Sequence, residues 1–219
     1  MKKFQHEFLT FALDIGAIRF GQFKLKSGRI SPYFFNAGLF NTGAKLAKLG
    51  NFYAQAAMES GIDFDMVYGP AYKGIPLAAA LTISLSEQHG RDLPYAFNRK
   101  EAKTHAEGGI IVGAPLAGKV LIIDDVISAG LSVKEAVVTI KAQGATPVGV
   151  LIALDRQERG ADKISAVSEV EEACHLKVHH IVSLNTLKDF LVQAGKAGEQ
   201  GDYAEHLRAI EAYQQQYGA

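Results

Sequence analysis

Apolar residues along the chain alternate between short continuous runs and longer segments with helical spacing. The runs Val120–Ile123 and Val148–Leu154 are apolar throughout or nearly so, as in strands that are covered on both faces of a sheet. Between them, apolar residues recur on one helical face, at Val133, Ala136, Val137 and Ile140. A strand, a helix and a strand within this length favour parallel pairing with a right-handed connection. The pattern therefore predicts an open, doubly wound α/β sheet that is mostly parallel and flanked by helices.

The same two patterns predict further elements on both sides of this unit. The expected helices lie around Phe4–Ala12, Leu46–Ala56, Ile75–Ser86, Leu187 and Leu207, and the expected strands lie near 23–26, 30–35, 66–68, 93–98 and 178–182. Ser27–Gly28, between the first two strands, is typical of a hairpin turn. The stretch Arg99–Gly113 is polar, glycine-rich and without a regular period, so we expect a mobile loop there.

Composition and charge narrow the classes of function. The 219 residues are 48% apolar and 21% charged, as in a folded chain of one generous domain. Lysine and arginine number 23, as do aspartate and glutamate, so no global positive field would collect nucleic acid. The single cysteine, Cys174, cannot form an internal disulfide. The sequence lacks a secretory signal and any run of roughly 18 apolar residues. We therefore expect a cytoplasmic protein with neither nucleic-acid nor membrane partners.

The expected site of chemistry follows the central apolar run. Ligands of open α/β sheets bind beyond the carboxyl ends of the strands, which is where the segment Asp124–Ser132 lies. Asp124 and Asp125 can accept hydrogen bonds from vicinal ribose hydroxyls and offset positive charge that develops on the sugar ring. The small and hydroxyl-bearing residues that follow can wrap a phosphate with backbone N–H groups at a helix N-terminus. The segment thus favours a ribose 5-phosphate ligand.

Other interpretations of this segment stay open when it is taken alone. Two aspartates after a strand also occur in receiver domains and in magnesium sites. Ser132 with Glu135 fits a capping box, which would give Ser132 a purely structural role.

A second group of residues offers positive charge for a diphosphate. Potential cations lie close together at Arg99, Lys100, Lys103 and His105. Such a charge run is usually a solvated face, but the diphosphate of a phosphoribosyl donor needs several donors of this kind. Tyr72-Lys73-Gly74 lies between a strand and a helix, so Lys73 and nearby backbone N–H groups can add a further contact.

Together these motifs resemble those of the type I phosphoribosyltransferases. The run from Val120 to Ser132 is similar to their signature for 5-phosphoribosyl-1-diphosphate (PRPP). The order Arg-Lys-x-x-Lys-x-His at 99–105 is similar to the catalytic loop of the orotate phosphoribosyltransferases, and the likeness to bacterial members of that family covers nearly the whole chain. It implies one phosphoribosyltransferase domain over 1–219, with a small hood formed mainly by about residues 1–40 and in part by the C-terminal segment.

The resemblance also implies a reaction and the residues that perform it. The reaction is transfer of the phosphoribosyl group from PRPP to N1 of orotate, with release of pyrophosphate, in de novo pyrimidine synthesis. The implied cofactor is Mg²⁺, bound mainly through PRPP and without certain protein ligands. The implied assembly is a homodimer in which the Arg99–Gly109 loop of one subunit reaches the site of the other. The implied catalytic residues are Lys103, His105, Asp124 and Asp125. The residues implied to bind orotate are Phe34, Phe35, Ser128 and Arg156. The residues implied to bind PRPP are Lys26, Tyr72, Lys73, Arg99, Lys100, Lys103, His105, Asp124, Asp125, Val126, Ile127, Ser128, Ala129, Gly130, Leu131 and Ser132.

The chemistry of orotate agrees with these residues. Orotate is a flat ring with a carboxylate, so an aromatic face and a cation are the expected contacts. Adjacent residues of a strand point to opposite faces, so at most one of Phe34 and Phe35 should stack on the ring. Core packing of the phenylalanines and a surface ion pair of Arg156 are the plainer interpretations.

The chain departs from the family pattern at two positions. Ser128 stands where threonine is usual, and Leu131 stands where a second hydroxyl is common. We expect weaker or rearranged phosphate contacts and an intact reaction.

Two rival functions fit the sequence less well. A phosphoribosyltransferase for another base is disfavoured by Lys26, the phenylalanine pair and Arg156. A PRPP-sensing regulator that binds nucleic acid is disfavoured by the balanced charge and the lack of a clear helix-turn-helix.

Overall fold

The computed structural model describes residues 1–25, 27–103, 109–160, 164–196 and 202–219, and at 100–103 and 109 it describes only the backbone. Within these residues, a six-stranded sheet has the order β5-β4-β3-β6-β7-β8, and a separate sheet joins β1 to β2. The strands are β1 (Ile18–Lys24), β2 (Ile30–Phe35), β3 (Met66–Gly69), β4 (Tyr95–Lys103), β5 (Gly109–Gly113), β6 (Lys119–Asp124), β7 (Thr146–Asp155) and β8 (Val178–Ser183). The helices are α1 (Lys3–Asp14), α2 (Gly43–Ser60), α3 (Gly74–His89), α4 (Leu131–Ala142), α5 (Ala166–Cys174), α6 (Leu184–Lys196) and α7 (Tyr203–Tyr217), with a 3-10 turn at Ala37–Leu39.

The sheet has the predicted topology. Its strands pair in parallel from β4 to β8, and β5 alone among the described strands of this sheet runs antiparallel, at the edge next to β4. β6 lies in the interior, where Met66 of β3 pairs with Val120 and Asp124 pairs with Ile152 of β7. An open, mostly parallel α/β sheet is therefore confirmed.

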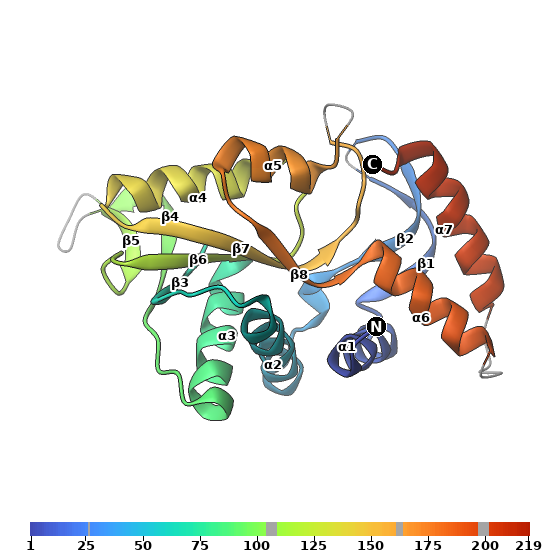
Figure 1. Ribbon diagram of the computed structural model, residues 1–219, viewed down its shortest axis with the longest axis horizontal. Helices are drawn as coiled ribbons and strands as arrows, with labels where there is room; N and C mark the ends of the chain where they lie inside the picture. Colours follow the sequence, from blue (N-terminus) through green and yellow to red (C-terminus); the bar gives the residue numbers. More distant parts are fainter. Residues whose placement is uncertain (26, 104–108, 161–163, 197–201) are drawn as a thin grey trace.

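Helices cover both faces of the sheet, as its apolar strands require. α1, α2 and α3 lie on one face, and α4 and α5 lie on the other (Figure 1). Val67, Leu121 and Ile123 pack toward the first layer, and Ile122 and Val150 pack toward the second. The alternation within β6 places the carboxyl end of the strand between two packed layers, so its last residues have a fixed position.

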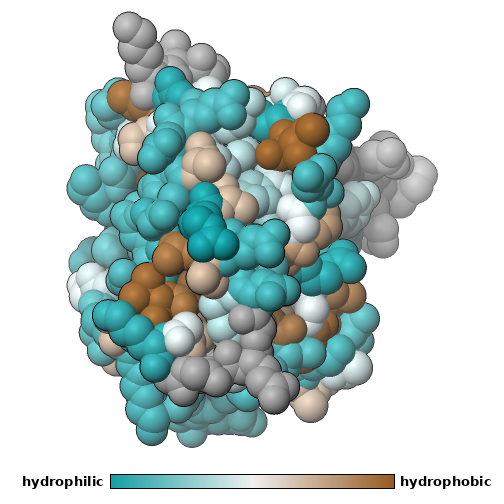
Figure 2. Space-filling view, turned by 90° about the vertical axis from the view of Figure 1, so that its right-hand side faces the viewer, coloured by the Kyte–Doolittle hydropathy of each residue, from teal (hydrophilic) through white to brown (hydrophobic). Residues whose placement is uncertain are grey.

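The β1–β2 hairpin lies beside α6 and α7 at one end of the molecule (Figure 1). Helix α7 contacts both β2 and α6, and Phe20 of β1 stacks on His206 of α7 with ring centroids 4.3 Å apart. Where described residues are visible, this end of the molecule is mostly hydrophilic, with small separate apolar patches (Figure 2). No helix in the described part of the chain combines the length and the hydropathy needed to span a bilayer.

The prediction of a mobile loop over Arg99–Gly113 is wrong for most of this segment, which forms strands. β4 continues to Lys103, and β5 returns antiparallel to it, with Asn98 opposite Ile111 and an irregularity before Lys103 pairs with Gly109. Antiparallel pairing satisfies the backbone groups of polar residues without requiring an apolar pattern. Residues 104–108 lie outside the described residues.

Two local details also differ from the sequence-based expectation. The prediction of a capping box at Ser132 is wrong. Helix α4 begins at Leu131 with Gly130 as its N-cap and without a side-chain cap, and the hydroxyl of Ser132 binds the carboxylate of Asp124.

Helix α5 was not predicted from the sequence. Ser165 caps it by accepting a hydrogen bond from the N–H of Ser168. It is short, and most of its stability comes from packing.

Candidate active site

Asp124 and Asp125 end strand β6 with their carboxylates held by hydrogen bonds. Asp124 accepts from the backbone N–H of Asp125 at Oδ1 and from the hydroxyl of Ser132 at Oδ2, both at 2.9 Å. Asp125 accepts from the N–H of Val126 at 2.9 Å and pairs with Lys73 Nζ at 2.5 Å. Asp124 is 9% exposed and Asp125 is 4% exposed. Two buried carboxylates are thus presented with fixed orientations.

The carboxyl group of Asp124 resists ionisation. Burial, and after it the charge of neighbouring Asp125, raise the pKa of Asp124 to about 6, against the opposing effects of the hydrogen bonds from the Asp125 N–H and Ser132 and of the charge of Lys73. A buried carboxylate that is costly to ionise is stabilised when hydroxyl groups or cations of a ligand approach it.

A cavity of about 280 Å³ opens at the carboxyl ends of β3 and β6. Its walls are Pro70, Ala71, Tyr72, Lys73, Asp124, Asp125, Val126, Ser128 and Ser132. A larger depression of about 490 Å³ lies between α6 and α7, lined by Lys188, Glu211, Gln214 and Gln215. The smaller cavity is the better candidate site because it joins buried carboxylates, a lysine and a helix N-terminus at strand ends.

The loop between β6 and α4 has the features of a phosphate cradle. Ile127 is buried and anchors the loop, whereas Ser128 and Ala129 are exposed. Gly130 has φ +67°, and a Cβ there would lie 2.2 Å from Cγ2 of Val170, so the turn requires glycine. Because no side chain caps α4, its first N–H groups are available to an anion. Leu131, the first residue of α4, is 66% exposed.

The turn from β3 to α3 forms the other wall. A Cβ on Gly69 would lie 2.1 Å from the carbonyl oxygen of Gly74, so the strand and the helix approach as closely as glycine allows. Between them the N–H of Ala71 donates to Oδ1 of Asn98 at 2.9 Å. This turn exposes Tyr72 and brings Lys73 to Asp125.

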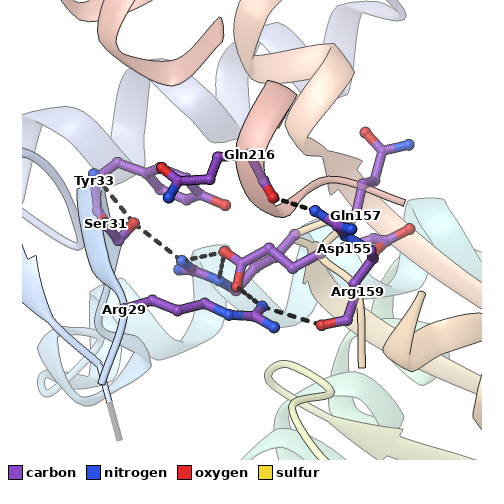
Figure 3. A network of polar contacts seen from close by, with 9 residues as sticks. Arg29, Ser31, Tyr33, Asp155, Gln157, Arg159 and Gln216 are labelled. Carbon is purple, nitrogen blue, oxygen red and sulfur yellow. Dashed lines mark hydrogen bonds and ion pairs between the residues drawn. The ribbon is translucent and has the colours of Figure 1, made fainter. Parts of the chain in front are cut away.

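Arg156 follows β7, the next strand, at the same edge of the sheet. Its guanidinium donates to Glu158 and to the hydroxyl of Ser31 and lies 4.4 Å from the centroid of the Tyr33 ring. The carbonyl of Asp125 accepts from the N–H of Ala153 in β7, which joins this group to the acidic pair. Figure 3 shows this polar network, with Ser31 of β2 and Arg29 of the hairpin turn before it reaching toward the segment of Asp155, Gln157 and Arg159. Arg156 does form an ion pair, with Glu158, but its side chain is only 14% exposed, so the pair belongs to a mostly shielded network and not to a solvated surface.

The two phenylalanines of β2 have different surroundings. Phe35 is 7% exposed and belongs to the core, where its ring lies 6.5 Å from that of Phe8. Phe34 is half-buried and stacks on Phe23, with ring centroids 5.5 Å apart. The rings point to opposite faces of the strand, so Phe34 is the one that remains accessible. Their roles toward a base stay predictions.

Some predicted site residues cannot be placed fully. Lys26 and His105 lie outside the described residues, and only the backbones of Lys100 and Lys103 are described, within β4. Arg99 precedes them in the same strand and is half-buried. The assigned roles of all these residues stay predictions.

Three residues of the site were missed from the sequence. Tyr53 of α2 donates its hydroxyl to the carbonyl of Asp124 at 2.9 Å, and Ser31 and Glu158 both bind Arg156. Tyr53 and Ser31 gave no usable signal, because their partners are 71 and 125 positions away. The sequence offered a weak indication for Glu158, because a carboxylate two residues after Arg156 at a strand end can pair with it.

Comparison with known proteins identifies the family. The model of the phosphoribosyl transferase domain matches residues 39–182. The chain is 63% identical to the orotate phosphoribosyltransferase of Thioalkalivibrio sulfidiphilus over 218 residues, covering 100% of both chains. The crystal structure of orotate phosphoribosyltransferase from Francisella tularensis is 40% identical with a TM-score of 0.85, covering 97% of this chain and 100% of that chain. The Mycobacterium tuberculosis enzyme in complex with PRPP is 22% identical, with a TM-score of 0.62 over 84% of this chain and 98% of that chain, and shares the fold. The chain therefore belongs to the orotate phosphoribosyltransferases, within the phosphoribosyltransferase family.

Proposed function

We propose that the chain transfers the 5-phosphoribosyl group of PRPP to N1 of orotate, giving orotidine 5′-phosphate and pyrophosphate. The observation that carries this proposal is the cavity in which the buried pair Asp124 and Asp125 meets Lys73 and the uncapped N-terminus of α4. Family membership supports the same activity. The cavity lies at the carboxyl ends of the adjacent strands β3 and β6, where α/β sheets bind ligands.

The residues divide by the part of PRPP that they would contact. The N–H groups and hydroxyls from Ser128 to Ser132 would hold the 5-phosphate, and Asp124 and Asp125 would accept hydrogen bonds from the ribose hydroxyls. Lys73 and Tyr72 would meet the pyrophosphate. At present Lys73 pairs with Asp125, and this pair would loosen as the diphosphate attracts the lysine.

The transition state would carry positive charge on the ribose ring as the bond from C1 to pyrophosphate breaks and the bond to N1 forms. The carboxylate pair would stabilise this charge because it is buried and already oriented. Lys103, with His105, would stabilise or protonate the departing pyrophosphate. Arg156 would bind the carboxylate of orotate, and Phe34 would contact the flat ring.

Magnesium fits this site as an ion held mainly through the substrate. Among the described residues no three His, Cys, Asp or Glu side chains converge, while Asp124 and Asp125 offer carboxylate oxygens beside the cavity. Mg²⁺ commonly binds through substrate phosphates, one or two carboxylates and water, and it would neutralise charge on the pyrophosphate.

The proposal also includes a homodimer in which residues 99–109 of one subunit reach the site of the other. The support is the family likeness and the position of β4 and β5 at the edge of the sheet. Closure of this segment would exclude water from the cationic transition state of the sugar. The cytoplasmic location stays a prediction.

The test is to incubate the protein with Mg²⁺, PRPP and orotate and to follow the pyrimidine absorbance and the release of pyrophosphate. We expect turnover that requires each of the three components. Replacing orotate by uracil, adenine or hypoxanthine separates the proposed reaction from that of a phosphoribosyltransferase for another base. Turnover with one of these bases in preference to orotate would refute the assignment.

A further inference from the structure

The carboxylate of Glu158 holds the guanidinium of Arg156 in one orientation. Its Oε1 accepts from Nε of Arg156 at 2.8 Å and from Nη2 at 2.5 Å. The two side chains are 13% and 14% exposed, so the pair is largely shielded from water. A shielded pair of opposite charges with two hydrogen bonds keeps a fixed geometry much better than a solvated one.

The rest of the guanidinium is bounded by hairpin residues. Nη2 also donates to Oγ of Ser31 at 3.1 Å, and the face of the guanidinium lies over the ring of Tyr33 at 4.4 Å. The hydroxyl of Ser31 in turn donates to the carbonyl of Tyr33 at 2.7 Å, which fixes the serine. The hydrogen bonds of Arg156 to Glu158 and Ser31 use Nε and Nη2, so the Nη1 group takes part in neither of them and can turn to a further acceptor. The phenol of Tyr213 in α7 also borders Arg156 and Glu158.

Glu158 serves a second cation as well. Nη1 of Arg29 lies 3.5 Å from Oε2 of Glu158 and donates to the carbonyl of Arg159 at 3.0 Å. One carboxylate is thus shared by two guanidinium groups. Burial opposes the charge of Arg156, but Tyr33 and Glu158 outweigh it and raise the pKa of Arg156. The group stays cationic and is only partly neutralised, as a site for a second carboxylate requires.

The backbone that carries Glu158 is itself fastened to the end of α7. Glu158 pairs with Gly218 in an antiparallel bridge, and the N–H of Arg159 donates to the carbonyl of Tyr217 at 2.9 Å. The side chain of Arg159 donates to the carbonyl of Gln216, as Figure 3 shows. These contacts with the end of α7 fix the position of Glu158, in addition to its attachment to the end of β7.

We propose that Glu158 is a positioning residue for orotate, which orients Arg156 so that the guanidinium meets the carboxylate of the base. This inference rests on the proposed function. It gives Glu158 a role in the choice of base and none in the chemistry at the ribose, which takes place at the acidic pair. Arg29 completes the arrangement by holding the other oxygen of Glu158.

The test uses the full chain with Glu158→Gln. We expect the KM for orotate to rise about tenfold or more, since loss of one member of a buried charge pair leaves the other poorly held, while the KM for PRPP stays within about twofold. Uracil lacks the carboxylate, so its inhibition constant should change little. Glu158→Asp keeps the charge but shortens the reach and should give an intermediate rise.

Two controls separate positioning from general damage. Glu171→Gln removes a partly buried carboxylate that pairs with Lys177 away from the site, and it should leave both KM values unchanged. In an Arg156→Gln background, Glu158→Gln should raise the KM for orotate no further, because its partner is absent.

Three results would overturn the proposal. A parallel rise of both KM values and of the uracil inhibition constant would indicate general structural damage. A fall in the KM for orotate would show that Glu158 competes with the base for Arg156, and an unchanged value would show that the pair has no role in binding. Failure of the unaltered chain to use orotate at all would instead refute the proposed function.

Discussion

The hydroxyl of Tyr53 donates a hydrogen bond to the backbone carbonyl of Asp124 at 2.9 Å. Tyr53 belongs to α2 and is fully buried. A helix that is distant in the sequence therefore fixes the backbone of Asp124, the first residue of the acidic pair. Burial, followed by the charges of Asp125 and Asp124, raises the pKa of Tyr53 well above its ordinary value. The phenol therefore stays protonated, and remains a donor, at neutral pH.

Tyr53→Phe removes this donor and keeps the ring. We expect a loss of about 1 to 3 kcal/mol in the free energy of unfolding, because a buried carbonyl loses its partner, and a fall in kcat/KM for PRPP. Denaturant unfolding and initial rates would measure the two effects. Tyr95→Phe, at a partly exposed position in β4, is the control and should change neither. Equal stability of Tyr53→Phe and the parent chain would contradict the prediction.

The pKa of Asp124 predicts how stability depends on pH. Folding raises it from 3.8 to about 6, first through burial and then through Asp125. A raised pKa means that folding favours the protonated group, so this contribution is present below about pH 4 and is lost as the pH rises through about 6. Asp124→Asn should therefore gain stability relative to the parent chain between pH 4 and pH 7, by on the order of 1 to 3 kcal/mol. Unfolding curves at both pH values test this; a constant difference would count against it.

Gly69 tests the close approach of β3 and α3. In Gly69→Ala the new Cβ would meet the carbonyl of Gly74 at 2.1 Å, and backbone atoms cannot move aside cheaply. We expect destabilisation of about 1 to 3 kcal/mol or more and weaker PRPP binding, since the turn that carries Lys73 must shift. Gly195→Ala in α6, where a Cβ meets nothing within 4 Å, should instead stabilise the chain by up to about 1 kcal/mol. Calorimetry of both variants gives the comparison.

Lys103 tests the assignment of the leaving-group contact. Lys103→Ala should lower kcat about a hundredfold or more, because proton transfer or charge stabilisation acts in the transition state, and it should weaken orotate binding far less. Steady-state rates with orotate and PRPP varied in turn measure both effects. Lys119→Ala, which removes an exposed lysine paired with Asp63, is the matched control. An unchanged kcat would remove the assigned role.

Leu131 tests the departure from the family pattern. Leu131→Thr adds a hydroxyl at the start of α4, beside the expected phosphate, and should lower the KM for PRPP by roughly twofold to tenfold through one added hydrogen bond. Leu131→Val, which is branched at Cβ but has no hydroxyl, should not lower it. If both variants behave alike, backbone N–H groups alone hold the phosphate.

Much of the fold and part of the site were predictable from local patterns. Strands such as Val120–Ile123 are apolar throughout because both faces of a parallel sheet are covered, and this run also located Asp124 and Asp125. The strand extension through Lys103 was not predictable, because an edge ribbon needs only backbone pairing and leaves no apolar period. The capping-box pattern at Ser132 gave a wrong prediction, because the hydroxyl of Ser132 donates a hydrogen bond to the carboxylate of Asp124 instead.

The sequence by itself determined the order of most strands and helices, the acidic pair at the end of a strand and the family likeness, because each depends on residues close together in the chain. The tertiary structure decided which distant residues support them. Tyr53 reaches Asp124, Lys73 reaches Asp125, and Ser31 and Glu158 together hold Arg156. Such pairings depend on how strands align and helices pack across the whole molecule, and no short-range pattern encodes them.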